Sequence, residues 1–327
     1  MSNTDQIMVT FDDVVAAVNR LKGVANKTPV MTSRNLSEIC GVQVFLKCEN
    51  FQRVGAFKFR GAYNCIAKRL SNNPELQQKG IVAISSGNHS QGVALAAKLL
   101  GVPVTIYLPE DAPPSKIEAT AGYGAKLEFF DREKDDRDDL ATRLIEQGVT
   151  LIHGYDDPDI IAGQGTAALE LMHEIPDLDL IMTPLGGGGL LSGTMIAARA
   201  YNPKIKVYGV EPEVANDWDL SIKAGKRMSI PAPKTIADGV SLCTPGKLPF
   251  EILKDQMDGV ILISEAEIIE ALSYVIERMK IVIEPSSALV VAALMKGKVP
   301  LDGISRAGLI ISGGNIDPKL LSSLFRI

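Results

Sequence analysis

Short apolar segments alternate with amphipathic ones along most of this chain of 327 residues, and this alternation constrains the fold more than any other feature. Short runs of hydrophobic residues predict strands, and the segments between them have helical periodicity. Strands that alternate with helices favour parallel sheets covered by helices on both faces. We therefore expect an α/β fold, with strands at residues 42–46, 81–84, 104–108, 126–130, 151–153, 180–183, 206–210, 260–263 and 308–311.

Three loops of unusual composition directly follow predicted strands. Their sequences are Ser-Ser-Gly-Asn-His at 85–89, Gly-Gly-Gly-Gly at 186–189 and Ser-Gly-Gly-Asn at 312–315. Ligands of open α/β folds bind outside the carboxyl ends of the strands. We therefore expect the three loops to converge on one site.

Composition narrows the range of ligands and locations. The formal net charge is -5, and no cluster of lysines with interleaved aromatic residues occurs, so nucleic-acid binding is not expected. The four cysteines show no Cys-x-x-Cys spacing and predict neither a disulfide framework nor a thiolate metal site. The N-terminus through Asp13 lacks the basic and apolar regions of a signal peptide, and Pro184 interrupts the long uncharged run at 180–198. We expect a cytoplasmic protein that acts on a small molecule and does not contact a membrane.

Lys58 lies in an apolar stretch, between Phe57 and Phe59. Burial among such groups would lower the pKa of its amine, because burial penalises the charged form. A neutral amine can form a Schiff base with a carbonyl compound. A surface lysine on a helix with ordinary aromatic neighbours is the alternative that these residues alone leave open.

The four glycines at 186–189 lie between a predicted strand and a helix that starts near Leu190. Such a loop lets backbone amides approach an anion at a helix N-terminus, and a phosphate is the expected ligand. One alternative is a tight turn without a ligand. The other is a dinucleotide fingerprint, because Glu211 ends the next predicted strand. The third glycine of that fingerprint is missing, however, and a nicotinamide enzyme has no use for Lys58.

The segment around Lys58, Gly-Ala-Phe-Lys-Phe-Arg-Gly, resembles the signature around the cofactor lysine of the fold-type II pyridoxal phosphate (PLP) enzymes, the serine and threonine dehydratases and serine racemases. The resemblance runs over nearly the whole chain, from Lys27 to Asn315. It implies a two-lobed α/β fold of the tryptophan synthase β type. Residues 1–78 and 157–327 would form the large PLP-binding domain, and residues 79–156 a small mobile domain that closes over the substrate.

The resemblance also implies the contacts of the cofactor. Lys58 would hold PLP covalently, Phe57 would pack beside its ring and Asn88 would contact its ring hydroxyl. The hydroxyl of Ser312 would face the pyridine nitrogen, where other PLP folds place an acid, and this favours elimination or racemisation. The other expected cofactor contacts are Gly186, Gly187, Gly188, Gly189, Leu190 and Glu284.

Loop 85–89 resembles the loop that grips the substrate carboxylate in these enzymes. Hydroxyls and backbone amides would bind this anion, and a helix N-terminus adds electrostatic attraction. Ser86 would also be the second acid/base opposite Lys58, since serine racemases have a hydroxyl at the matching position and a typical catabolic threonine dehydratase has alanine. The expected substrate contacts are Ser85, Ser86, Gly87, Asn88, His89, Arg137, Gly239 and Ser241.

The acidic loop after the strand at 206–210 is a candidate metal site. Acidic loops of this kind are most often solvated, which is the alternative. In serine racemases and the related hydroxyaspartate dehydratases, matching carboxylates and a carbonyl bind magnesium, calcium or manganese, hard cations that prefer oxygen ligands. The resemblance thus implies a Mg²⁺, Mn²⁺ or Ca²⁺ site at Glu211, Ala215 and Asp217.

We therefore expect a PLP-dependent serine racemase that interconverts L- and D-serine and also dehydrates serine and threonine to the 2-oxo acid and ammonia. An L-threo-3-hydroxyaspartate or threonine/serine ammonia-lyase without significant racemisation is the main alternative. A β-replacement enzyme of the cysteine synthase type and a non-catalytic amino-acid sensor remain further alternatives, although the intact Lys58 argues against a sensor. The resemblance also implies a homodimer and admits a nucleotide effector.

Overall fold

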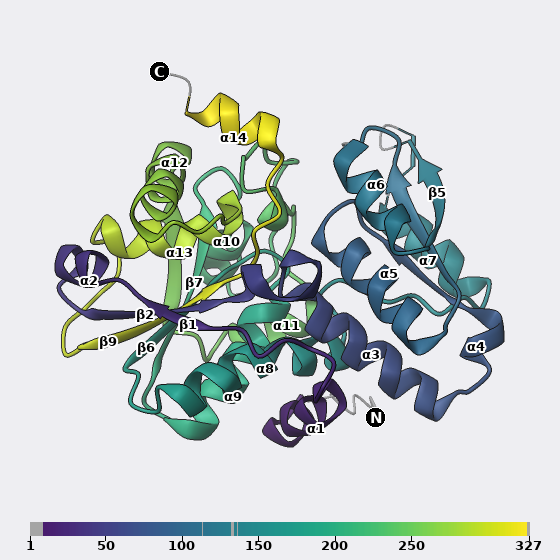
Figure 1. Ribbon diagram of the computed structural model, residues 1–327, viewed down its shortest axis with the longest axis horizontal. Helices are drawn as coiled ribbons and strands as arrows, with labels where there is room; N and C mark the ends of the chain where they lie inside the picture. The colour runs from purple at the N-terminus through teal and green to yellow at the C-terminus, as the bar shows by residue number, and fades with distance from the viewer. Residues whose placement is uncertain (1–8, 113, 132–133, 136, 326–327) are drawn as a thin grey trace.

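Two separate β-sheets organise the chain (Figure 1). The computed structural model describes residues 9–112, 114–131, 134–135 and 137–325, so residues 1–8 of the N-terminal segment lie outside it. The larger sheet has six strands in the order β1-β2-β9-β6-β7-β8, and the smaller has three in the order β3-β4-β5. The strands are β1 (Val30–Thr32), β2 (Gln43–Cys48), β3 (Ile81–Ile84), β4 (Val104–Pro109), β5 (Lys126–Phe130), β6 (Leu180–Pro184), β7 (Lys206–Pro212), β8 (Gly259–Ile263) and β9 (Arg306–Ile311).

All pairs of neighbouring strands are parallel except β1 with β2. Helices connect the parallel strands, as such connections require. The α-helices of the described residues are α1 (Phe11–Leu21), α2 (Arg34–Cys40), α3 (Lys58–Asn72), α4 (Leu76–Lys79), α5 (Asn88–Leu100), α6 (Pro114–Gly122), α7 (Arg137–Glu146), α8 (Pro158–Glu174), α9 (Gly189–Tyr201), α10 (Asp217–Ala224), α11 (Lys247–Leu253), α12 (Glu265–Tyr274), α13 (Pro285–Met295) and α14 (Pro318–Leu324).

Helices cover both faces of the larger sheet. Alternate strand residues face opposite sides, so Leu180 and Met182 pack in a core with α2, α12 and α13, while Ile181 packs in a second core with α8, α9 and α11. The smaller sheet lies to the right in Figure 1 and packs against α3 and α5. It falls within residues 79–156, the segment predicted as the small domain.

The start of α8 shows how the local sequence fixes a helix beside the site. Asp157 caps the helix by accepting hydrogen bonds from the backbone amides of Asp159 at 2.8 Å and Ile160 at 3.0 Å. Pro158 occupies the first helical position, where its missing N–H costs nothing. The segment before Asp157 therefore enters the helix in a fixed geometry.

The predicted α/β fold is confirmed, and eight of the predicted strands agree with the structure within two residues at each end. The predicted strand at 151–153 is wrong, since Leu151 forms an isolated bridge with Val82. The chain turns away at residue 153 because the His153 side chain binds the next backbone amides. The sequence also did not predict β1, which is too short to show a period. No helix among the described residues has the length and apolarity to cross a membrane.

Candidate active site

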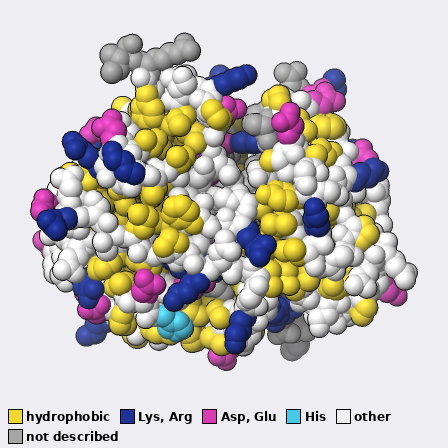
Figure 2. All heavy atoms as spheres, viewed as in Figure 1, with side chains coloured by type: hydrophobic (Ala, Val, Ile, Leu, Met, Phe, Trp, Pro, Cys, Tyr) yellow, Lys and Arg dark blue, Asp and Glu magenta, His cyan; other side chains and the backbone are white. Residues whose placement is uncertain are grey.

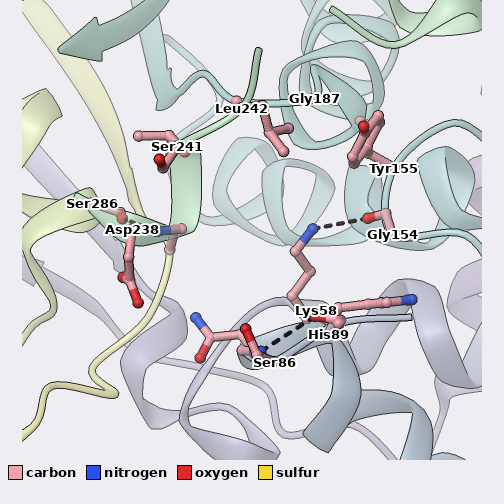
Figure 3. A pocket seen from close by; sticks show the side chains of 18 of the residues that line it. Lys58, Ser86, His89, Gly154, Tyr155, Gly187, Asp238, Ser241, Leu242 and Ser286 are labelled. Atoms are coloured by element: carbon pink, nitrogen blue, oxygen red, sulfur yellow. Dashed lines mark hydrogen bonds between the residues drawn. The ribbon is translucent and has the colours of Figure 1, made fainter. Parts of the chain in front are cut away.

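A cavity of about 600 Å³ lies where segments from the two sheets meet. Lys58 extends into this cavity, and Ser86 lies in its wall (Figure 3). The three predicted loops do converge here. All the predicted cofactor and substrate residues line the cavity: Phe57, Lys58, Ser85, Ser86, Gly87, Asn88, His89, Arg137, Gly186, Gly187, Gly188, Gly189, Leu190, Gly239, Ser241, Glu284 and Ser312.

Lys58 is the first residue of α3, and its half-buried side chain lines the cavity. Nζ donates a hydrogen bond to the carbonyl oxygen of Gly154 at 2.8 Å and lies 5.1 Å from the centroid of the Phe57 ring. Burial and, to a smaller extent, the positive charge of Arg137 lower the pKa of the amine to about 8, while Glu284 opposes the shift. At pH 7 about a tenth of the amine is then neutral and nucleophilic.

The glycine loop is packed so closely that side chains are excluded. A Cβ atom on Gly187 would lie 2.1 Å from the ring of Tyr155, and one on Gly188 would lie 2.4 Å from Trp218. Gly188 also has φ 89°, which favours glycine. The loop thus brings bare backbone to the N-terminus of α9, where the helix dipole favours an anion.

Asn88, Glu284 and Ser312 form the opposite wall. Asn88 Nδ2 donates to both carboxylate oxygens of Glu284, at 3.0 and 2.9 Å. Burial raises the pKa of Glu284 to about 7, although the hydrogen bond from Asn88 favours the carboxylate. The Ser312 hydroxyl lies 2.9 Å from that of Ser287, so this wall presents a neutral hydroxyl beside a carboxyl group that is only partly ionised.

The loop at 85–89 connects the end of β3 to the start of α5. The hydroxyl of Ser85 accepts a hydrogen bond from the backbone amide of Gly87 at 3.3 Å. His89 Nε2 lies 2.9 Å from the carbonyl oxygen of Ile152, and burial together with the charge of Lys58 lowers the pKa of His89 to about 3. The imidazole is therefore neutral, with its proton on Nε2, and it fixes the loop against residue 152.

Hydrogen bonds between a side chain and the backbone hold the remaining predicted substrate contacts. Arg137 Nη2 donates to the carbonyl oxygen of Ile84 at 3.3 Å, which brings the start of α7 to the end of β3. The backbone amide of Gly239 donates to the Ser286 hydroxyl at 3.0 Å, and the Ser241 hydroxyl donates to Pro233 O at 3.2 Å. These residues close the cavity from two sides.

Comparison with known proteins identifies the family. The family described as pyridoxal-phosphate dependent enzyme matches residues 21–313. The chain belongs to this family. It is 48% identical to an L-threo-3-hydroxyaspartate ammonia-lyase of Saccharomyces cerevisiae, over 97% of each protein. It is also 48% identical to a serine racemase of Schizosaccharomyces pombe, over 95% of each. The crystal structure of the serine racemase from Dictyostelium discoideum superimposes with a TM-score of 0.88 at 46% identity, covering 94% of this chain and 99% of that one.

The residues of the cavity fit PLP, the cofactor of this family. An amine of lowered pKa suits a covalent link to the aldehyde of the cofactor. The glycine loop leaves no room for side chains and suits the phosphate, and the wall formed by Asn88, Glu284 and Ser312 can contact the ring. The distance between Phe57 and the Lys58 amine places an aromatic face beside the point of attachment.

The segment 153–155 contributes to the cavity, although the sequence did not predict its role. The Nδ1 atom of His153 accepts hydrogen bonds from the backbone amides of Tyr155 at 3.3 Å and Asp156 at 2.9 Å. The resulting turn presents the Gly154 carbonyl to Lys58 and places Tyr155 against Gly187. A backbone carbonyl carries no sequence signal, so only the structure reveals this partner of the amine.

The three predicted metal ligands lie outside this cavity and are buried: Glu211 near the end of β7, Asp217 at the start of α10, and Ala215 between them. Glu211 accepts hydrogen bonds from the backbone amides of Asp219 at 2.9 Å and Trp218 at 3.3 Å. Burial raises the pKa of Glu211 to about 9 and that of Asp217 to about 7. Asp217 Oδ2 is buried without a hydrogen-bond partner. Two buried acids, one of which has an oxygen without a hydrogen-bond partner among the described residues, fit a bound cation better than a solvated loop.

A second acidic group does not need a metal. Ligand atoms of Cys65, Asp157 and Asp159 lie within 4.8 Å of one another. Both carboxylates are already paired with cations, Asp157 with Arg69 and Asp159 with Lys68. Asp157 serves as the N-terminal cap of α8, and Asp159 pairs with Lys68, so both carboxylates have a structural role.

Proposed function

We propose that this protein is a serine racemase that interconverts L- and D-serine and also dehydrates serine and threonine to the 2-oxo acid and ammonia. The observation that carries this proposal is that Lys58 and the hydroxyl residue Ser86 line one cavity. Two acid/base groups are needed to remove a proton from one face of a stereocentre and return a proton to the other. The names of the Schizosaccharomyces pombe and Dictyostelium discoideum relatives support the same reaction.

In this proposal, bound PLP would supply the electron-withdrawing group that makes the α-proton of the substrate acidic. Lys58 Nζ would remove the α-proton of L-serine, and Ser86 Oγ would exchange a proton on the opposite face. The glycine loop with Leu190 would hold the phosphate of the cofactor, and Phe57, Asn88, Glu284 and the neutral hydroxyl of Ser312 would hold its ring. The substrate contacts are Ser85, Ser86, Gly87, Asn88, His89, Arg137, Gly239 and Ser241.

We further propose that residues 79–156 form a small domain that closes over the substrate, and that residues 1–78 and 157–327 form the large domain. An ion pair between Lys116 of α6 and Asp238 supports this closure, because both residues line the cavity and lie 122 positions apart in the chain. In Figure 3, Asp238 lies across the cavity from Lys58. The homodimer and the nucleotide effector stay predictions of the family resemblance, and the cytoplasmic location stays a prediction from the composition and the N-terminal sequence.

We propose that Glu211, Asp217 and the carbonyl of Ala215 bind Mg²⁺, with Mn²⁺ or Ca²⁺ as substitutes. The orphaned oxygen of Asp217 supports this site, because a buried carboxylate without a partner is costly. Oxygen ligands of this kind suit hard divalent cations. The site lies outside the catalytic cavity, so its role is to stabilise the large domain.

A second candidate is an L-threo-3-hydroxyaspartate ammonia-lyase. The cations Lys116 and Arg137 both line the cavity and could pair with a second carboxylate. The name of the Saccharomyces cerevisiae relative supports it. Serine, threonine and 3-hydroxyaspartate should be supplied separately, and ammonia, the 2-oxo acid and D-serine measured. Formation of D-serine from L-serine supports the racemase. Release of ammonia from 3-hydroxyaspartate with no D-serine formed from L-serine would instead assign the protein as the lyase.

A further inference from the structure

The backbone reaches Lys58 through a strained turn. In the 3₁₀ turn η2 (Arg53–Gly55), Val54 has φ 57° and ψ 10°, a left-handed conformation that β-branched residues rarely adopt. Gly55 follows with φ 72°. Two consecutive left-handed residues thus reverse the chain just before Lys58. Such a conformation persists only when its surroundings hold it.

Asn315 holds the turn from the loop that follows β9. Its side-chain amide donates to the carbonyl oxygen of Val54 at 2.6 Å and to Asn88 Oδ1 at 2.9 Å, so both amide hydrogens are used. A Cβ atom on Gly55 would come within 2.5 Å of Asn315 Oδ1. The Asn315 side chain therefore lies directly against the left-handed turn.

The backbone next to this contact also pairs with the loop that follows β9. Two backbone hydrogen bonds join the residues after Val54 to the loop that contains Asn315. They are Gly314 N to Gly55 O at 2.9 Å and Phe57 N to Ser312 O at 2.9 Å, and together they form the antiparallel bridge between Ala56 and Gly313. These contacts begin at Gly55, so the Asn315 amide extends the pairing to the strained residue itself.

The second hydrogen of the Asn315 amide connects the turn to the helix after β3. Asn88 is the first residue of α5, and its own amide donates to both oxygens of Glu284. The backbone amide of Asn315 donates to the same carboxylate at 3.2 Å. One side chain thus fixes the turn that carries Lys58 relative to Asn88 and Glu284, which line the cavity with Lys58.

We propose that Asn315 is a positioning residue. It holds the strained turn at Val54 and so fixes the position of the Lys58 amine relative to Asn88. Asn315 itself lines the cavity, but both hydrogens of its side-chain amide are donated to Val54 and Asn88, so the proposed role is exerted through Val54. The inference rests on the membership of the PLP family and is independent of whether serine or hydroxyaspartate is the substrate. The proposal has a specific consequence. The loss of Asn315 should lower the rate of PLP uptake and kcat by a smaller factor when residue 54 can adopt the left-handed conformation without strain.

The test is a double-mutant cycle between Asn315→Ala and Val54→Gly. Glycine adopts positive φ without steric strain, so we expect the turn to keep its shape in the double variant. The readouts are the rate at which cofactor-free protein takes up PLP, hydrogen exchange of the peptide at 53–60, and kcat and KM for the preferred substrate. We expect Asn315→Ala to slow uptake and lower kcat by about tenfold to a hundredfold, because small displacements of a reacting group are costly.

In the Val54→Gly background, Asn315→Ala should lower the uptake rate and kcat by about threefold or less, as expected for coupled residues. Hydrogen exchange of the peptide at 53–60 should then be close to that of Val54→Gly alone. An equal loss in both backgrounds would overturn the proposal, since Asn315 would then act through Asn88 alone. An uptake rate unaffected by Asn315→Ala would also overturn it.

Two further variants keep the test decisive. Val54 is buried at 9% exposure, and if Val54→Gly fails to fold, Val54→Asn replaces it because asparagine also tolerates the left-handed region. Asn50→Ala is the matched control. Asn50 Nδ2 donates to Val282 O at 3.2 Å, a comparable amide contact near the same loop that does not touch the turn. If Asn50→Ala were coupled to Val54→Gly as strongly as Asn315→Ala is, Asn315 would have no specific role.

Discussion

The amine of Lys58 donates a hydrogen bond of 2.8 Å to the backbone carbonyl of Gly154, 96 positions away in the chain. A carbonyl oxygen accepts from both the neutral and the charged amine. This contact therefore fixes the position of the amine, while burial and the nearby charges set its protonation. Position and protonation of the reactive group thus depend on separate features of the site.

Uptake of PLP by the cofactor-free protein should depend on pH with a midpoint near the Lys58 pKa of about 8, below its ordinary value of 10.5. Only the neutral amine attacks the aldehyde, so the rate should rise with pH to about 8 and then level off. Arg137→Ala removes a positive charge that lowers this pKa and should move the midpoint upward. Visible absorbance followed after rapid mixing measures both. A midpoint that does not move in Arg137→Ala would contradict the role of that charge.

The same shift affects the stability of the cofactor-free protein. The folded-state pKa of Lys58 lies below the unfolded value, so the unfolded chain binds more protons between pH 8 and 10.5. The destabilising contribution of Lys58 is full below pH 8 and disappears as the pH rises through that window. Relative to Lys58→Met, the free energy of unfolding of the wild type should increase across it. Urea unfolding of both proteins at several pH values gives this difference, and parallel curves would show that the amine is not shifted.

Lys58→Ala should abolish the visible absorbance of the purified protein together with its activity. Lys58 is the lysine that projects into the cavity beside Phe57 and the glycine loop, and covalent attachment of PLP requires its amine. Absorbance spectra after reconstitution with PLP measure the link. Lys116→Ala is the matched control, since this second lysine of the cavity is paired with Asp238 and should leave the absorbance in place. A wild type that stays colourless with PLP would contradict the cofactor assignment.

The sequence predicted the parts of the site that depend on particular residue types. The apolar setting of Lys58 and the glycines at 186–189 each allow few interpretations, and the alternation of strands and helices brings their loops together. The Gly154 carbonyl could not be predicted, because every residue carries one. The Asn315 contact with Val54 could not be predicted either, because valine gives no sign of a left-handed conformation. Phe59 shows a further limit, since it packs on Tyr63 with a centroid distance of 5.8 Å rather than beside the amine.

Removal of divalent cations should lower the thermal stability of the protein, and Mg²⁺ should restore it. A ligand that binds only the folded state stabilises it by mass action, by about 2.7 kcal/mol at a concentration one hundred times its Kd. Asp217→Asn together with Glu211→Gln should remove the response to Mg²⁺. Melting temperatures with EDTA and with added Mg²⁺ measure it. Asp157→Asn tests the other acidic group and should leave the Mg²⁺ response intact, because its carboxylate is paired with Arg69. An unchanged response in the double variant would place the cation elsewhere.

Ser86→Ala should separate racemisation from elimination. Lys58 can remove the α-proton of L-serine alone, but inversion also needs a group that delivers a proton to the other face. Ser86 lies in the cavity wall on the loop between β3 and α5. Its loss should lower L-to-D interconversion and the turnover of D-serine by about 10²–10⁴-fold, the usual contribution of an acid/base group. Elimination from L-serine should largely survive.

The measurement is D-serine formed from L-serine, with pyruvate formed in the same reaction as the internal reference. Ser85→Ala is the matched control, because Ser85 is the neighbouring hydroxyl residue of the same loop and accepts a hydrogen bond from Gly87. Ser85→Ala should slow both reactions to a similar degree, because Ser85 helps to hold the loop at 85–89 that is expected to bind the substrate carboxylate. In deuterated water, the Ser86→Ala variant should still exchange the α-proton of L-serine for deuterium, but it should form little deuterated D-serine. Racemisation at the wild-type rate in Ser86→Ala would assign the second proton transfer to another group and remove the main support for a racemase.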